Sequence, residues 1–223
     1  MRFLFTIFFT SLFSLVGLTF SAQAKEVGEW ELELEEDTAQ LRVYTRKIEG
    51  SSLKEFKGEM LVDTTLTALS SLLLDADAAP EWMHQCEKFE VIEEVAPQDI
   101  VIHFINGAPW PVSDRDAVVS SQMTQNPETL AVRIDVKALT DYLPEDDDYV
   151  RIPRMEGHWA FIPQDGKVLV RYQIHAEPGG SLPAWLANSV VVDTPQHTML
   201  NMLEMLKRDK YKQAKMTRIK NVL

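Results

Sequence analysis

The segment EPGGSLPAWLANSVVVDTPQHTMLNMLEMLK, residues 177–207, decides the fold of this chain. Its first residues, Glu-Pro-Gly-Gly, end a run of strands, and from Leu182 onward apolar side chains recur at helical spacing. The pattern predicts a C-terminal helix whose broad apolar face packs on a sheet. Pro195 should kink or restart this helix, with Asp193 or Thr194 as a cap. The apolar positions of the expected helix are Leu182, Trp185, Leu186, Val190, Leu200, Leu203 and Leu206.

The chain before this helix is mostly β. A short helix is expected at residues 28–38, and a second helix carries Leu66, Leu69, Leu72 and Leu73 behind the cap residues Asp63 to Thr65. Val, Ile and Phe dominate the segments between turn signals, which is typical of strands. The prediction is an α+β fold in which a strongly curved antiparallel sheet wraps around the terminal helix. Strands are expected at residues 40–48, 53–62, 89–95, 100–105, 117–124, 130–139, 150–162 and 167–176.

The N-terminus has the pattern of a secretory signal. Arg2 is followed by an apolar run at residues 3–20 and by the triplet Ala22-Gln23-Ala24, so cleavage is expected after Ala24. The alternative is an uncleaved anchor. The run is only marginally long enough for this, because a bilayer core is about 30 Å thick. We predict a secreted or periplasmic protein. Residues 25–223 contain no repeat and no linker, so one domain is expected.

Charge and cysteine content exclude several classes of function. The net charge is −12, which argues against nucleic acid as a partner. Cys86 is the only cysteine, so the chain has no internal disulfide, and its thiol is expected to be a buried apolar filler. A monomer without a cofactor is expected. Basic residues crowd the C-terminal end beyond Leu206, where they suit either a helix C-terminus or a transient contact with an anionic membrane.

Four motifs, in order, resemble those of the START lipid-transfer family. APWPVSDRD at residues 108–116 is similar to the family's Pro-x-Pro-x-Ser-Asn-Arg-Asp motif, with Asp114 in place of Asn. The other three lie at residues 81–93, 157–159 and 177–188. The resemblance implies a helix-grip (START/Bet v 1-like) fold whose interior holds one sterol, phospholipid or similar apolar molecule. Ala79 and Met83 replace residues that family members use for phosphocholine, so the ligand class stays open.

The resemblance places Arg115 in or beside the cavity, where a guanidinium suits a carboxylate or phosphate. The alternative is a framework ion pair with Asp114, Asp116 or Asp99, the last of which stands at a matching family position. Trp110, between two prolines, stiffens the loop before this strand or stands at the entrance to the cavity. Trp185 is a core residue first, and part of the ligand wall only if a hollow exists.

His103, His158 and His175 fall on predicted strands and could face inward, where a neutral imidazole hydrogen-bonds a ligand. For each of them a framework role is the alternative. No histidine or carboxylate spacing fits a metal site, and residues 143–148 lack the alternating ligands and the glycine of an EF-hand loop.

Three functions are consistent with the sequence. The first is a binding or transfer protein for a lipid or other apolar small molecule in the cell envelope, which performs no catalysis. The second is an enzyme on the same scaffold that resembles polyketide cyclases and aromatases, with Arg115 or a histidine polarising a carbonyl. The third is an interaction module whose interior is filled. An apolar hollow under the last helix distinguishes the first two from the third.

Overall fold

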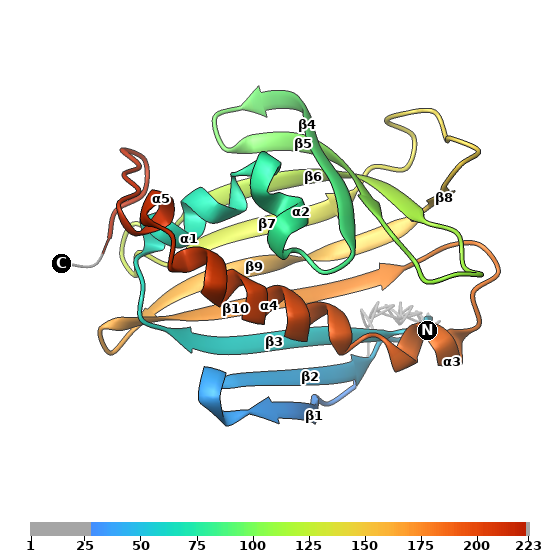
Figure 1. Ribbon diagram of the computed structural model, residues 1–223, viewed down its shortest axis with the longest axis horizontal. Coiled ribbons are helices and arrows are strands. Elements are labelled where there is room, and N and C mark those ends of the chain that lie inside the picture. The colour runs from blue at the N-terminus through green and yellow to red at the C-terminus, as the bar shows by residue number, and fades with distance from the viewer. Residues whose placement is uncertain (1–27, 222–223) are drawn as a thin grey trace, which may run out of the picture.

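The structure is a computed structural model that describes residues 28–221. One ten-stranded sheet, in the order β1-β2-β3-β10-β9-β7-β6-β5-β4 with β8 beside β6, dominates the described chain (Figure 1). All neighbours are antiparallel except β8 and β6. The strands are β1 (Glu31–Glu36), β2 (Leu41–Lys47), β3 (Lys54–Val62), β4 (Cys86–Ala96), β5 (Asp99–Asn106), β6 (Arg115–Gln125), β7 (Val132–Ala138), β8 (Val150–Arg151), β9 (Arg154–Gln164) and β10 (Lys167–Glu177).

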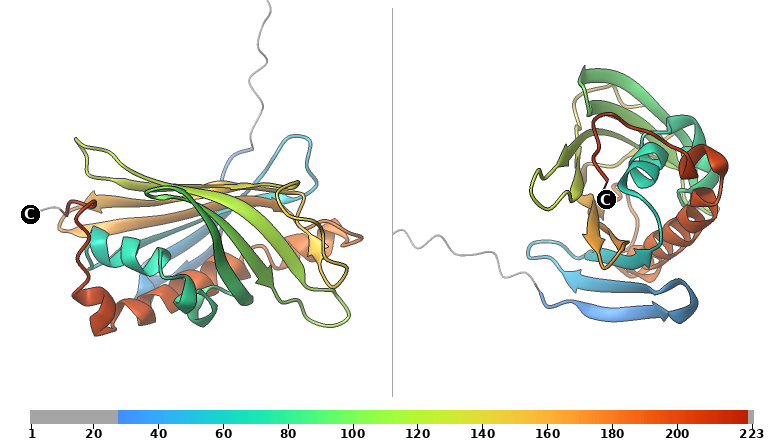
Figure 2. Two further views of the ribbon diagram at one scale, coloured as in Figure 1. Left: turned by 90° about the horizontal axis from the view of Figure 1, so that it is seen from above. Right: turned by 90° about the vertical axis from the view of Figure 1, so that its left-hand side faces the viewer.

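The helices close the open side of the curved sheet, as the end-on view shows (Figure 2). They are α1 (Leu66–Leu73), α2 (Ala79–Trp82), α3 (Ala184–Ser189), α4 (Asp193–Leu206) and α5 (Asp209–Lys212), with short 3-10 turns at Asp37–Ala39 and Ala76–Ala78. Thr65 caps α1 by accepting a hydrogen bond from the Ala68 amide at 3.1 Å. The α+β helix-grip architecture expected from the sequence is confirmed. None of the described helices is long and apolar enough to cross a membrane.

Two elements differ from expectation. The helix expected at residues 28–38 is instead the edge strand β1 followed by a 3-10 turn. Its sequence ELELEE alternates with the period of a strand, and pairing with β2 satisfies the backbone groups on that side. The strand expected at residues 150–162 is divided into β8 and β9, because Pro153 lacks an amide hydrogen and cannot continue the ladder.

The C-terminal helix restarts where Pro195 predicts, with α3 before the break and α4 after it. The residue that precedes α4 is Val192, and neither Asp193 nor Thr194 provides a side-chain cap. Pro195 occupies the first turn of α4, where its missing amide hydrogen removes no hydrogen bond inside the helix.

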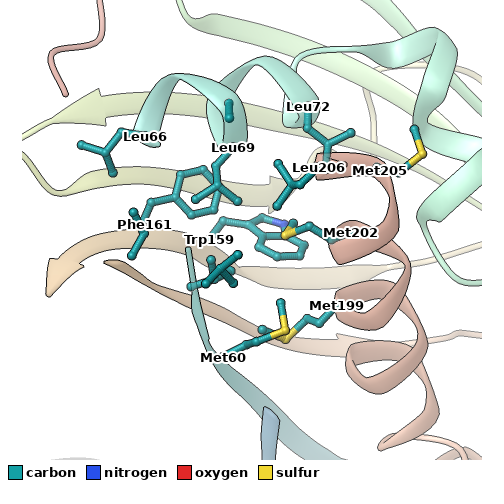
Figure 3. Packing of buried hydrophobic residues seen from close by; sticks show 14 of the residues in the cluster. Met60, Leu66, Leu69, Leu72, Trp159, Phe161, Met199, Met202, Met205 and Leu206 are labelled. Atoms are coloured by element: carbon teal, nitrogen blue, oxygen red, sulfur yellow. The ribbon is translucent and has the colours of Figure 1, made fainter. Parts of the chain in front are cut away.

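A cluster of buried apolar side chains lies between part of α4, α1 and the sheet (Figure 3). Met199 and Met202 of α4 are fully buried against Met60, Trp159 and Phe161 of the sheet. Leu66, Leu69 and Leu72 of α1 complete this cluster.

Gly58 on β3 permits the close approach of α4, because a Cβ there would collide with the Met199 sulfur and crowd Pro195. The helix face that is most deeply buried therefore carries methionines. Leu200 and Leu203, which the periodicity placed on the apolar face, are only half-buried.

We expect Met202→Ala to lower the free energy of unfolding by about 2–5 kcal/mol, because it opens a void in a region that is packed without gaps. Val95→Ala is the control. Val95 is 58% exposed near the end of β4, and its truncation should change stability by less than about 0.5 kcal/mol. Urea denaturation measures both values. Equal effects of the two substitutions would contradict the packing described for α4.

Candidate functional site

A cavity of about 380 Å³ lies under α3 and the first turns of α4, beside the buried apolar cluster. Its floor is the concave face of β5, β6, β7, β9 and β10, and its roof is α3 with the first turns of α4. The loop between β5 and β6 and the loop between α2 and β4 complete the wall. Apolar floor residues include Phe104, Ile102, Val119, Val136, Trp159 and Ile174, and apolar roof residues include Leu182, Leu186 and Val191.

The cavity wall is apolar with a few polar groups. Tyr172 stacks on Trp159 with ring centroids 3.8 Å apart, and burial raises the pKa of its phenol well above the ordinary value. Burial also raises the pKa of the Cys86 thiol to about 11, which keeps this thiol protonated at neutral pH. Among the described residues that line the cavity there is no aspartate and no glutamate. Within residues 28–221 no cluster of histidine, cysteine or carboxylate side chains could hold a metal ion.

Arg115, the first residue of β6, lies in the cavity wall as the resemblance implied. Its side chain is 9% exposed, and its Nη1 donates to the backbone carbonyl of Ser113. The buried Nε has no hydrogen-bond partner. Burial lowers the pKa of this guanidinium, against a smaller opposing effect of Asp114.

The ion pairs considered for Arg115 do not form among the described residues. Asp116 faces the opposite side of β6, where Arg151 donates to both of its carboxylate oxygens at 2.9 Å. The His103 ring also contacts this carboxylate, with an Nε2 to Oδ2 distance of 3.0 Å. Burial alone would raise the pKa of Asp116, but the hydrogen bonds from Arg151 and His103 outweigh it and lower the pKa.

Asp114 and Asp99 are engaged elsewhere. Asp114 Oδ1 accepts a hydrogen bond from the Ala108 amide at 2.8 Å, which closes the β5–β6 loop on itself. Asp99 begins β5 opposite Gln122, whereas Arg115 pairs with Asn106 at the other end of that strand. At about 3.4 Å per residue, the seven residue steps between these pairs place Asp99 roughly 24 Å from Arg115.

The three strand histidines lie on the face of the sheet opposite to the cavity. Their neighbours Ile102, Trp159 and Ile174 line the cavity, and consecutive side chains on a strand point to opposite faces. The expectation that the histidines face inward is therefore corrected. His103 holds Asp116, His158 is half-buried, and His175 is buried 3.7 Å from Glu177.

The two candidate tryptophans are on the surface beside the cavity. Trp110 is 93% exposed in the β5–β6 loop, and Trp185 is 72% exposed on α3. Pro109 of the same loop and Leu186 of the same helix line the cavity. Trp185 therefore belongs to neither the core nor the ligand wall.

Sequence reasoning missed a pair of histidines at the seam between α4 and the α2–β4 loop. The rings of His84 and His197 stack with centroids 4.6 Å apart, and the His84 amide donates to Thr198 Oγ1 at 3.0 Å. His84 and Thr198 line the cavity. The residues are distant in the sequence, and only the register of α4 on the sheet brings them together.

A curved sheet that grips a terminal helix over an apolar cavity defines the class of helix-grip ligand-binding domains. Residues 19–210 match the START domain family, and this chain belongs to that family. The motif resemblance found in the sequence is thereby confirmed.

Similar proteins are found in bacteria and in animals. A solved fragment of a STAR-related lipid transfer protein from Xanthomonas axonopodis is 37% identical with a TM-score of 0.74, and the alignment covers 80% of this chain and 99% of that one. An uncharacterized protein of Pseudomonas aeruginosa is 31% identical over 77% of this chain and 83% of its own length. The ceramide transfer protein of Xenopus tropicalis is 25% identical, and this chain aligns with 31% of its length.

We expect the free energy of unfolding to fall as the pH is lowered from about 7 to about 5, a window above the titration of most carboxylates. Burial, followed by the charge of His197, lowers the pKa of His84 in the folded protein, while Asp193 opposes them. The unfolded chain therefore binds the proton first, and stability present at neutral pH is lost on acidification.

Urea denaturation at a series of pH values tests this expectation. His84→Gln should lose less stability than the unmodified protein over the same window. His158, whose pKa is also lowered by burial, contributes in the same direction and is present in both proteins. Identical losses for the two proteins would show that His84 does not titrate as described.

Proposed function

We propose that this protein binds one lipid or similar apolar molecule in the cavity under α3 and α4 and carries it between membranes of the cell envelope. The observation that carries the proposal is an apolar cavity of about 380 Å³ in a START fold. Burial of apolar surface contributes about 25 cal/mol per Å², so an apolar hollow of this size binds a water-insoluble molecule without any chemical step.

The proposed function does not include catalysis. The cavity wall combines a protonated thiol, a neutral phenol, the Arg115 guanidinium and the Lys54 ammonium, and none of these groups is a base at neutral pH. The histidine that lines the cavity stacks on a second histidine rather than on a carboxylate. A catalytic pair of histidine and carboxylate is not formed by the described residues of this wall.

The envelope location rests on the N-terminal sequence alone. The apolar run and the Ala22-Gln23-Ala24 triplet are the support for export and for cleavage after Ala24. These residues lie outside the part of the chain that the structure describes.

Membrane contact is proposed for the end of the molecule that carries Trp110 and Trp185. Both rings are exposed beside the cavity wall, and tryptophan partitions favourably into the membrane interface. The basic C-terminal segment, by contrast, lies at the opposite end of the molecule from α3 (Figure 1). Lys207, Arg208 and Lys210 there form ion pairs with Glu204, Glu81 and Asp75.

Val136→Trp tests the cavity as the binding site. Val136 lies on the cavity floor and is half-buried, so the larger ring extends into the hollow and excludes a ligand. We expect this variant to lose co-purifying and added lipid, measured by mass spectrometry of the protein after incubation with a lipid extract. Lys137→Trp places the same ring on the exposed outer face and should retain lipid. Retention of lipid by both variants would refute the proposed site.

The double variant Trp110→Ala/Trp185→Ala tests whether the end of the molecule that carries these two residues contacts the membrane. Burial of one large apolar side chain is worth about 1.5–3 kcal/mol, so the loss of both should weaken binding to neutral phosphatidylcholine vesicles at least tenfold. Vesicle co-sedimentation measures the effect. Val95→Ala, at an exposed apolar residue near the end of β4, is the control and should bind normally. Unchanged binding by the double variant would assign membrane contact to another surface.

A further inference from the structure

Arg115 is a buried cation in a wall that offers it no anion. Its side chain is 9% exposed and its Nε has no hydrogen-bond partner. No carboxylate of the described residues lies within 4.0 Å of its guanidinium. A buried charge without a counterion is costly, so this position favours a ligand that supplies one.

The contrast with Arg151 shows that the fold can pair a buried arginine when the pair is structural. Arg151 donates to both oxygens of Asp116 and to the backbone carbonyls of Leu143 and Pro144, and these contacts raise its pKa. The neighbouring Arg115 has one backbone acceptor, and burial lowers its pKa. The available carboxylate is thus used outside the cavity, and the guanidinium inside is left with free donor capacity.

The surroundings of Arg115 are suited to the head of an amphiphile. Asn106 is its cross-strand partner on β5 and lines the same cavity, so an amide stands beside the guanidinium. Beyond this polar end the floor is apolar along Phe104, Val119 and Ile174. The cavity, at about 380 Å³, lies near the lower limit of ligand pockets, which favours one acyl chain over two.

We propose that the ligand is a single-chain amphiphile with an anionic head, and that the head is seated on the Arg115 guanidinium. This inference rests on the proposed function and names the class of molecule that the cavity takes. A carboxylate and a phosphate both match the fixed donors of arginine, so a fatty acid and a lysophosphatidic acid are the two sources of this head group.

Three probes of equal chain length separate the contributions of head and chain. They are palmitate, hexadecanol and palmitoyl lysophosphatidate, each titrated by displacement of a fluorescent fatty acid analogue from the delipidated protein. We expect palmitate or lysophosphatidate to bind on the order of ten to a hundred times more tightly than hexadecanol, because a hydrogen bond to a charged group is at stake. The tighter of the two anionic probes identifies the head group.

Arg115→Gln assigns this preference to the guanidinium. The variant keeps a donor amide without the charge, so the anionic probes should lose on the order of ten- to a hundredfold in affinity while hexadecanol is unchanged. Arg115→Lys keeps the charge and should retain part of the preference. Arg133→Gln removes an exposed arginine of β7 that pairs with Asp135, and it is the matched control.

The outcomes are distinct. If hexadecanol binds as tightly as the anionic probes, and Arg115→Gln changes no affinity, the binding of an anionic head by Arg115 is refuted while the proposed apolar carrier function stands. If none of the three probes binds, both proposals fail. Thermal unfolding of each variant confirms that it is folded; an Arg115→Gln protein that is folded but binds palmitate normally overturns the inference.

Discussion

The packing of α4 on one half of the sheet is the interaction on which the cavity depends. Met199 and Met202 meet Met60 and Trp159 without gaps, and Gly58 lets the helix lie close to β3. Because this half is close-packed, the helix is held at a fixed height above the rest of the sheet. The neighbouring half cannot collapse onto its own apolar lining without breaking those contacts. A solid core and a hollow are thus two parts of one arrangement.

Much of this fold could be predicted because strands and helices carry different periods. The positions of most strands, the helix restart at Pro195 and the cap of α1 follow from turn residues and alternation, whereas the order of the strands in the sheet was not predicted. The edge strand β1 was missed because its acidic residues suit a helix start, although the pattern ELELEE alternates as a strand does. Leu200 and Leu203 were assigned to the apolar face while Met199 and Met202 were not named, because periodicity does not distinguish leucine from the methionines beside it.

The site was harder to predict. Alternate side chains of a strand point to opposite faces of the sheet, so a residue lines the cavity only if its position in the strand places it on the concave face. Arg115 and Asp116 are adjacent on β6, so their side chains must point to opposite faces, and this alone excludes an ion pair between them. Which face is the inner one depends on the whole sheet, because apolar residues occur on both. His103, His158 and His175 consequently lie on the far face, and His84 in a loop reaches the cavity instead. The volume of the hollow is a property of facing side chains that no single segment encodes.

The charge on the protein surface and the charge in the cavity wall have opposite signs and act on different steps. The chain carries a net charge of −12, yet the described wall of the cavity has no carboxylate and one unpaired guanidinium. Repulsion between the acidic surface and an anion is screened beyond about 10 Å at 0.1 M salt, whereas a buried guanidinium acts at contact in a medium of low polarity. The surface therefore governs the approach to an anionic membrane, for which uncharged tryptophan anchors are suited. In the proposed function, the local field at Arg115 governs which molecule is retained once water has been excluded.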